Sequence, residues 1–155
     1  MSPARISHWL MKSEPETFSI DDLHERGVEP WDGVRNYQAR NFMRDGMRKG
    51  DSVFFYHSNC AEPGIVGLAT IASDAYPDPS QFDPKSDYFD AGSSRDNPRW
   101  LLVDVAFKRK LKRTITLKEL QAMPALADMA LVRKGNRLSV MPVSAAEWKT
   151  ILAQE

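Results

Sequence analysis

The stretch SVFFYHSNCAEPGIVGLATIAS, residues 52–73, sets the fold class of this chain. Residues 52–57 and 65–73 are rich in β-branched and aromatic side chains, which favour strands. The residues between them, 58–64, include Ser, Asn, Pro and Gly, which form turns. The stretch therefore predicts two strands joined as a hairpin.

Working outward, the chain alternates irregularly between strand and helix patterns. Side chains with N-cap propensity stand at Ser19, Asn36, Thr116 and Ser144, and each predicts the start of a short helix. We expect one helix to close at Gly27 and another to run from residue 37 to 48. Further strands are predicted at residues 7–12, 100–107 and 138–143. This mixed order favours an α+β fold with a small, largely antiparallel sheet or barrel.

The bulk composition is that of a soluble globular domain, and we expect a single domain over residues 1–155. No window has the length and apolar character of a membrane span, so we expect no membrane partner. One cysteine, Cys60, excludes an internal disulfide and fits a reducing compartment. We expect a cytoplasmic protein, associated with the nucleoid in a bacterium or nuclear in a eukaryote. Nothing in the chain calls for a cofactor or a second copy, and we expect a monomer.

The formal net charge is zero, but the charges are segregated along the chain. Residues 1–100 hold 11 Lys/Arg and 16 Asp/Glu, whereas residues 101–155 hold 10 and 5. Such segregation is compatible with a local basic face on a neutral protein. It argues against a polycation that coats nucleic acid.

Catalytic and metal-binding motifs are absent from the sequence. There is no phosphate-binding glycine loop and no G-x-S-x-G elbow. The three histidines lack the spacing of a metal site, so we expect no metal. His57 and Cys60 are three residues apart, so a catalytic thiol–imidazole pair remains open. The alternative is that Cys60 is an unreactive cysteine in a turn.

Polar and aromatic residues gather where predicted strands end, which is the pattern of a base-binding pocket. A planar base needs an aromatic face for stacking and fixed donors and acceptors for its edge. Trp31, in a polar Gly/Pro turn, is the best candidate for that face, because Trp9, Trp100 and Trp148 lie in apolar segments typical of a core. The predicted pocket comprises Lys12, Ser13, Trp31, Val34, Asn36, Tyr56, His57 and Ser58.

Cations near this predicted pocket could contact the phosphates of a nucleic acid. We expect such contacts from Arg35, Arg40 and Arg133, the last of which lies in a turn with two further cations. Arg40, Arg44 and Arg48 share one face of a predicted helix, and that stripe could equally be a solvated surface. The basic run 108–113 could instead protect a sheet edge by its charge.

Long strings of this sequence resemble the EVE domain family. They include WLMKSEPETFSIDDL at residues 9–23, WDGVRNYQARNFMR at 31–44 and GDSVFFYHSN at 50–59. The resemblance spans nearly the whole chain and implies a PUA-like fold, a small mixed β-barrel surrounded by short helices, akin to the YTH readers of methylated adenine. It also implies a reader of modified bases, with modified cytosine in DNA as the usual suggestion.

Three functions remain open at this point. The first is a non-catalytic module that binds DNA or RNA and reads one modified base. The second is a hydrolase of modified nucleosides, in which Lys12 and Glu14 would activate a nucleophile. The third is a protein-interaction adaptor that uses the long polar and aromatic segment at residues 74–98.

Overall fold

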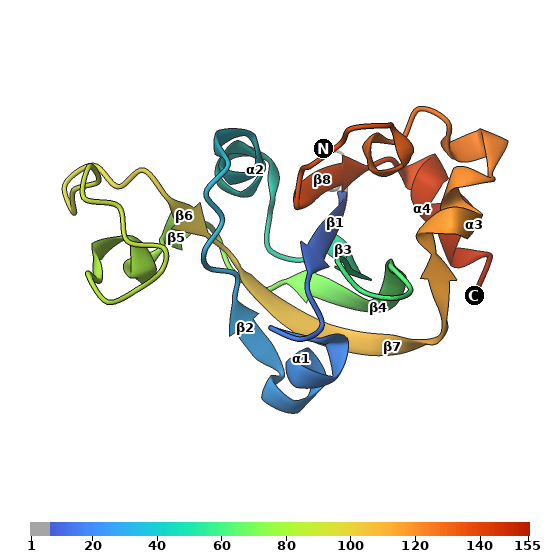
Figure 1. Ribbon diagram of the computed structural model, residues 1–155, viewed down its shortest axis with the longest axis horizontal. Helices are drawn as coiled ribbons and strands as arrows, with labels where there is room; N and C mark the ends of the chain where they lie inside the picture. Colours follow the sequence, from blue (N-terminus) through green and yellow to red (C-terminus); the bar gives the residue numbers. More distant parts are fainter. Residues whose placement is uncertain (1–6) are drawn as a thin grey trace, which may run out of the picture.

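A computed structural model describes residues 7–155, and residues 1–6 lie outside the described part. A six-stranded sheet curves into a half-barrel at its centre, and short helices surround it (Figure 1). The strands lie in the order β2 (Val28–Pro30), β7 (Asp104–Thr116), β4 (Gly64–Ile71), β3 (Ser52–His57), β1 (His8–Ser13) and β8 (Val140–Val143). A separate pair, β5 (Tyr76–Pro77) and β6 (Leu101–Leu102), lies beside it.

The predicted hairpin and the α+β class are confirmed. Strands β3 and β4 pair antiparallel, from Ser52 opposite Thr70 to His57 opposite Gly64. Strand β1 runs parallel to β3, and every other pair in the sheet is antiparallel. The register of β4 shifts twice along β7, and such irregularities bend a sheet. The curvature brings the ends of β1 and β2 toward one side of the half-barrel, where the site lies.

Side chains of β1 and β3 alternate between two buried clusters, one on each face of the sheet. Met11 and Phe55 belong to the first cluster, which also contains Trp31. Leu10, Phe54 and Tyr56 belong to the second cluster, under the C-terminal helix. This division follows from the two-residue period of a strand. It decides which of the predicted aromatic residues can meet.

The helices begin where the predicted caps stand. Ser19 caps α1 (Ile20–Arg26), and Ser144 caps α4 (Ala145–Leu152), each with a complete capping box. Asn36 and Thr116 accept hydrogen bonds from the first turns of α2 (Tyr37–Asn41) and α3 (Leu117–Gln121). Gly27 ends α1 at φ +81°, as predicted. Within residues 7–155 no helix has the length and apolar character needed to cross a membrane.

Three predicted segments differ from the structure. The helix predicted to reach residue 48 changes to a π-helix over Phe42–Gly46, and the N–H of Arg48 donates to Asp51 instead (2.9 Å). The strand predicted at 100–107 is divided in the structure: Leu101–Leu102 form β6, which pairs with β5, whereas β7 begins at Asp104 and continues through the basic run to Thr116. The segment 74–98 is ordered locally by β5 and by the 3-10 helix at residues 79–82. Two more 3-10 turns, Pro124–Leu126 and Ala130–Val132, precede β8.

Candidate nucleic-acid interface

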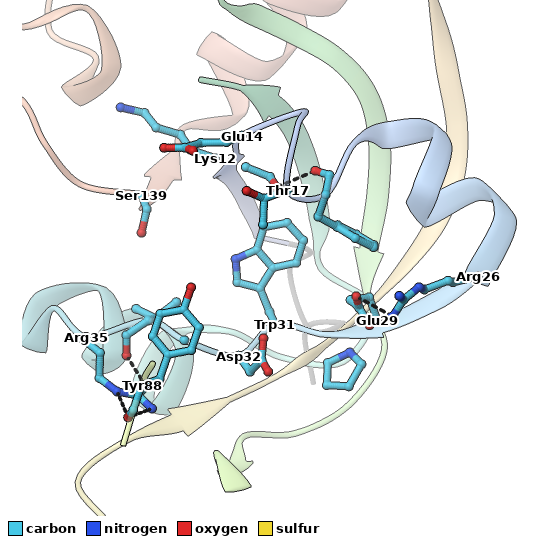
Figure 2. A pocket seen from close by; sticks show the side chains of 15 residues that line it. Lys12, Glu14, Thr17, Arg26, Glu29, Trp31, Asp32, Arg35, Tyr88 and Ser139 are labelled. Carbon is cyan, nitrogen blue, oxygen red and sulfur yellow. Dashed lines mark hydrogen bonds and ion pairs between the residues drawn. The ribbon is translucent and has the colours of Figure 1, made fainter. Parts of the chain in front are cut away.

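A cavity of about 540 Å³ opens between the end of β1 with the segment that follows it, the end of α1, and β2 with the loop that follows it (Figure 2). Two residues that are more distant in the sequence complete its lining. Its volume lies within the range of pockets that hold small planar ligands. Aromatic, aliphatic and charged side chains line it together. The lining residues are Lys12, Ser13, Glu14, Thr17, Phe18, Arg26, Glu29, Pro30, Trp31, Asp32, Gly33, Val34, Arg35, Tyr88 and Ser139.

Trp31 lies at the centre of this lining. Its backbone N–H donates to the carbonyl of Val103 (2.9 Å), which extends the pairing of β2 with β7 by one residue. The indole meets Phe55 and Phe18 edge to face, with ring centroids 5.6 and 6.4 Å away. It is 8% exposed, yet it lines the cavity, and Figure 2 shows its ring nitrogen facing the open space. Trp31 is therefore fixed on its core side and available on its cavity side.

The buried carboxylate of Asp78 holds the loop that follows Trp31. It accepts hydrogen bonds from the N–H of Gly33 (2.9 Å), from Arg35 (3.1 Å) and from Ser80 (2.6 Å). Burial alone would raise the pKa of Asp78, but these hydrogen bonds outweigh it and leave the pKa below its ordinary value. The carboxylate therefore stays ionised and ties the β2–α2 loop to the segment after β5.

Tyr88 forms the wall of the cavity that faces Trp31 in Figure 2. Its carbonyl accepts two hydrogen bonds from Arg35 (2.8 and 3.1 Å), and its ring lies against Gly33. The hydroxyl group has no partner among residues 7–155 and points into the open space in Figure 2. The sequence flagged the aromatic residues of segment 74–98, but no local pattern connected Tyr88 with Trp31. Only the fold brings them together.

Charged groups at the cavity have altered acidities. Desolvation, followed by the neighbouring carboxylate of Asp78, raises the pKa of Asp32. Burial lowers the pKa of the Lys12 ammonium group. Carboxylate oxygens such as those of Asp32 and Glu14 can accept hydrogen bonds from an exocyclic amino group of a base. The cavity thus combines stacking surfaces with groups suited to a polar edge.

Half of the predicted pocket lines this cavity and half lies elsewhere. Lys12, Ser13, Trp31 and Val34 are in the lining. Tyr56 is not, because it points to the opposite face of the sheet from Trp31 and packs in the second cluster.

The other three predicted pocket residues serve local structure. Asn36 is exposed and caps α2. The N–H of Ser58 donates to the carbonyl of Ser13 (3.0 Å). His57 lines a neighbouring hollow of about 340 Å³, and its Nε2 accepts the N–H of Ile20 (3.1 Å). Burial lowers the pKa of His57, which keeps the ring neutral for this hydrogen bond.

The predicted phosphate contacts divide in a similar way. Arg35 donates all five of its N–H groups within the protein, to Val34, Asp78, Ser80 and twice to Tyr88. A phosphate could bind it only by breaking one of these bonds, so Arg35 positions the loop. Arg40 bonds to the carbonyl of Arg99 (2.8 Å) and to the side chain of Asn41, outside the cavity lining. Arg133 is exposed.

The geometry of the alternative catalytic pairs is incomplete. Glu14 accepts a hydrogen bond from Asn59 (3.3 Å) and makes no ion pair with Lys12 among the described residues. The thiol of Cys60 contacts the carbonyl oxygen of His57 (3.8 Å), while the imidazole Nε2 is already engaged with Ile20. Across residues 7–155, no group of three or more His, Cys, Asp or Glu side chains could hold a metal ion.

Known proteins resemble this chain over nearly its full length. Human thymocyte nuclear protein 1 is 48% identical over 168 residues, which cover 96% of this chain and 74% of that protein. A crystal structure of a Pseudomonas syringae protein superposes with a TM-score of 0.92 at 51% identity, covering 96% of this chain and 99% of the other. The human protein in complex with DNA containing 5-methylcytosine superposes with a TM-score of 0.91 at 46% identity, covering 96% of both chains.

The expected PUA-like architecture is confirmed by these structures and by a more distant one. The YTH domain of MRB1 from Zygosaccharomyces rouxii, at 13% identity, shares the fold with a TM-score of 0.56 and covers 99% of this chain and 89% of the other. Residues 7–154 match the model of the EVE domain. This chain belongs to the EVE domain family.

Proposed function

We propose that this protein is a non-catalytic reader that holds one modified nucleobase of a nucleic acid in the cavity between Trp31 and Tyr88. One observation carries the proposal. Two aromatic side chains face each other across a space of suitable volume, and their indole N–H and phenol O–H have no protein partner among residues 7–155. Groups of this kind are left for a ligand that is flat and polar at its edge.

The energetics are consistent with an extruded base. Taking a base out of its stack costs a few kcal/mol, and stacking on an aromatic side chain returns about 1–3 kcal/mol per base. The carboxylates of Asp32 and Glu14 are suited to accept a hydrogen bond from the amino group of cytosine or adenine, whereas thymine and uracil have a carbonyl group at that position. The relative in complex with DNA containing 5-methylcytosine makes that base the first to test.

The test compares oligonucleotides that are identical except for one base. Binding of DNA and RNA, single-stranded and duplex, with cytosine, 5-methylcytosine or N6-methyladenine at one position, is measured by fluorescence anisotropy. We expect one modified oligonucleotide to bind more tightly than its unmodified counterpart. Trp31→Ala should reduce that affinity about tenfold, since it removes the stacking face.

Because Trp31 is buried, replacing it can reduce binding through loss of folding. A second variant at an exposed residue separates the two causes. Tyr88 is 44% exposed and Phe89 is 43% exposed, but only Tyr88 lines the cavity. Tyr88→Ala should weaken binding of the preferred oligonucleotide, and Phe89→Ala should leave it unchanged. Folded Trp31→Ala and Tyr88→Ala variants that bind like the wild type would refute the proposal. Release of a free base or an altered nucleoside would show a hydrolase instead.

A further inference from the structure

A cationic turn lies at one edge of the cavity, between the 3-10 helix Ala130–Val132 and β8. Its three cations, Arg133, Lys134 and Arg137, are all exposed. None of them forms an ion pair within residues 7–155, whereas Arg26 and Arg35 in the cavity lining are paired with Glu29 and Asp78. Exposed cations without a protein partner remain available to an external anion.

Backbone hydrogen bonds attach this turn to the cavity. Gly135 has φ +81°, and the N–H of Asn136 donates to the carbonyl of Arg133 (3.3 Å), which closes the turn. The side chain of Asn136 then accepts the N–H of Leu138 (3.1 Å). Two residues beyond the turn, the carbonyl of Ser139 accepts the N–H of Lys12 (2.8 Å), and both of these residues line the cavity.

The two sides of Trp31 differ in which charges are paired. Figure 2 shows Ser139, the Lys12 ammonium group and the Glu14 carboxylate on one side of the indole, and Arg26 and Glu29 on the other. Arg26 and Glu29 neutralise each other as an ion pair (3.0 Å). On the Ser139 side, Lys12 and the three cations of the turn outnumber the single carboxylate of Glu14. A phosphate chain is attracted by such an excess of cations, so the backbone of a bound strand is favoured on the Ser139 side.

We propose that the turn at residues 133–137, together with Lys12, binds the phosphates that flank the extruded base. This assignment rests on the proposed base-reading function. It adds Lys134, Arg137 and Lys12 to the Arg133 contact expected from the sequence, and it excludes Arg35, whose N–H groups are occupied. Such contacts position the strand without reading its sequence.

The salt dependence of binding tests the turn separately from the base pocket. Affinity for a single-stranded DNA with one 5-methylcytosine, and for its unmodified counterpart, is measured at several salt concentrations. Each phosphate contact contributes about 0.7 to the slope of log K against log salt for single strands. The slope is negative, so Lys134→Ala/Arg137→Ala should reduce its magnitude by about 1.4 and weaken binding of both oligonucleotides by the same factor.

A matched control removes the same charge elsewhere. Lys118→Ala/Lys149→Ala changes two exposed lysines on α3 and α4, neither of which contributes to the cavity lining. We expect its slope and affinities to equal those of the wild type. An unchanged slope in the Lys134/Arg137 variant, or an equal loss in the control, overturns the phosphate assignment.

The outcomes also separate this proposal from the base-reading function. If the wild type binds both oligonucleotides equally while the turn variant still lowers the slope, base reading fails and the phosphate site stands as a nonspecific contact. If discrimination depends on Trp31 but the turn variant behaves like the wild type, only the phosphate site fails. Absence of binding to any oligonucleotide overturns both.

Discussion

At the scale of single residues, the shape of the cavity depends on Gly33. This glycine has φ +81°, a conformation that costs other residues about 1–2 kcal/mol. A Cβ atom placed there would lie 2.7 Å from the ring of Tyr88, which is closer than atoms can pack. A side chain at this position would therefore strain the backbone and also displace the aromatic wall.

Comparison of two glycines separates these effects. Gly27 has the same φ of +81°, but a Cβ atom placed there would meet no other atom within 4 Å. We expect Gly33→Ala and Gly27→Ala to lower the free energy of unfolding by about 1 kcal/mol through strain. Only Gly33→Ala should also weaken binding of the preferred oligonucleotide, which anisotropy can measure. Equal binding by both variants would mean that the position of Tyr88 does not matter for recognition.

At the scale of elements, Glu155 fastens the segment after α4 to β7. Both oxygens of the Glu155 side chain accept hydrogen bonds from Arg109 (2.6 and 2.7 Å), and one also accepts the N–H of Lys112 (2.9 Å). These interactions lower the pKa of Glu155 to about 2, with the Arg109 bonds as the main cause. The basic run that the sequence suggested as edge protection thus also binds the Glu155 side chain through Arg109.

This lowered pKa predicts how stability depends on pH. A carboxylate with a depressed pKa stabilises the fold above its ordinary pKa of 4.5, and the contribution disappears as pH falls toward 2. We expect Glu155→Gln to have a lower melting temperature than the wild type at neutral pH. The difference between the two melting temperatures should shrink as pH falls from 4.5 to 2. Glu16→Gln, at an exposed position, serves as the control. If the difference in melting temperature between Glu155→Gln and the wild type stays constant with pH, the ionised Glu155 side chain does not stabilise the fold as proposed.

At the scale of the whole molecule, the sheet separates the two buried clusters, which have different roles. The first cluster contains Trp31, which lines the cavity, and Phe55, which packs against Trp31. The second cluster contains Phe54, which stacks on Trp148 of α4 at 3.8 Å between ring centroids. Adjacent residues of one strand therefore stabilise opposite faces, and only the face of Phe55 supports Trp31.

Adjacent phenylalanines test this division. Phe54 and Phe55 are both fully buried, so replacing either with leucine should lower the free energy of unfolding by about 1–2 kcal/mol. Only Phe55→Leu should weaken oligonucleotide binding, since it loosens the support of Trp31. Denaturant melts and anisotropy measure the two effects. If Phe54→Leu weakens binding as much, the two faces are coupled rather than separate.

The sequence by itself determined the local structure. The hairpin at residues 52–73 and the helix caps at Ser19, Asn36, Thr116 and Ser144 form as predicted, because strand patterns and N-caps depend on neighbours along the chain. Lys12 and Ser13 were expected in the pocket from the end of the strand predicted at residues 7–12, and Trp31 from its polar Gly/Pro turn; both are local patterns, and all three residues line the cavity.

Only the tertiary structure decided which distant groups meet. Tyr88, 57 positions after Trp31 in the sequence, reaches it because Asp78 and Arg35 tie the two loops together. Tyr56 is kept away by the register of β3, which directs it to the other face of the sheet. The availability of an arginine likewise depends on the acceptors that the fold places around it. Side-chain pairing across a sheet is set by three-dimensional register, which residue spacing alone does not encode.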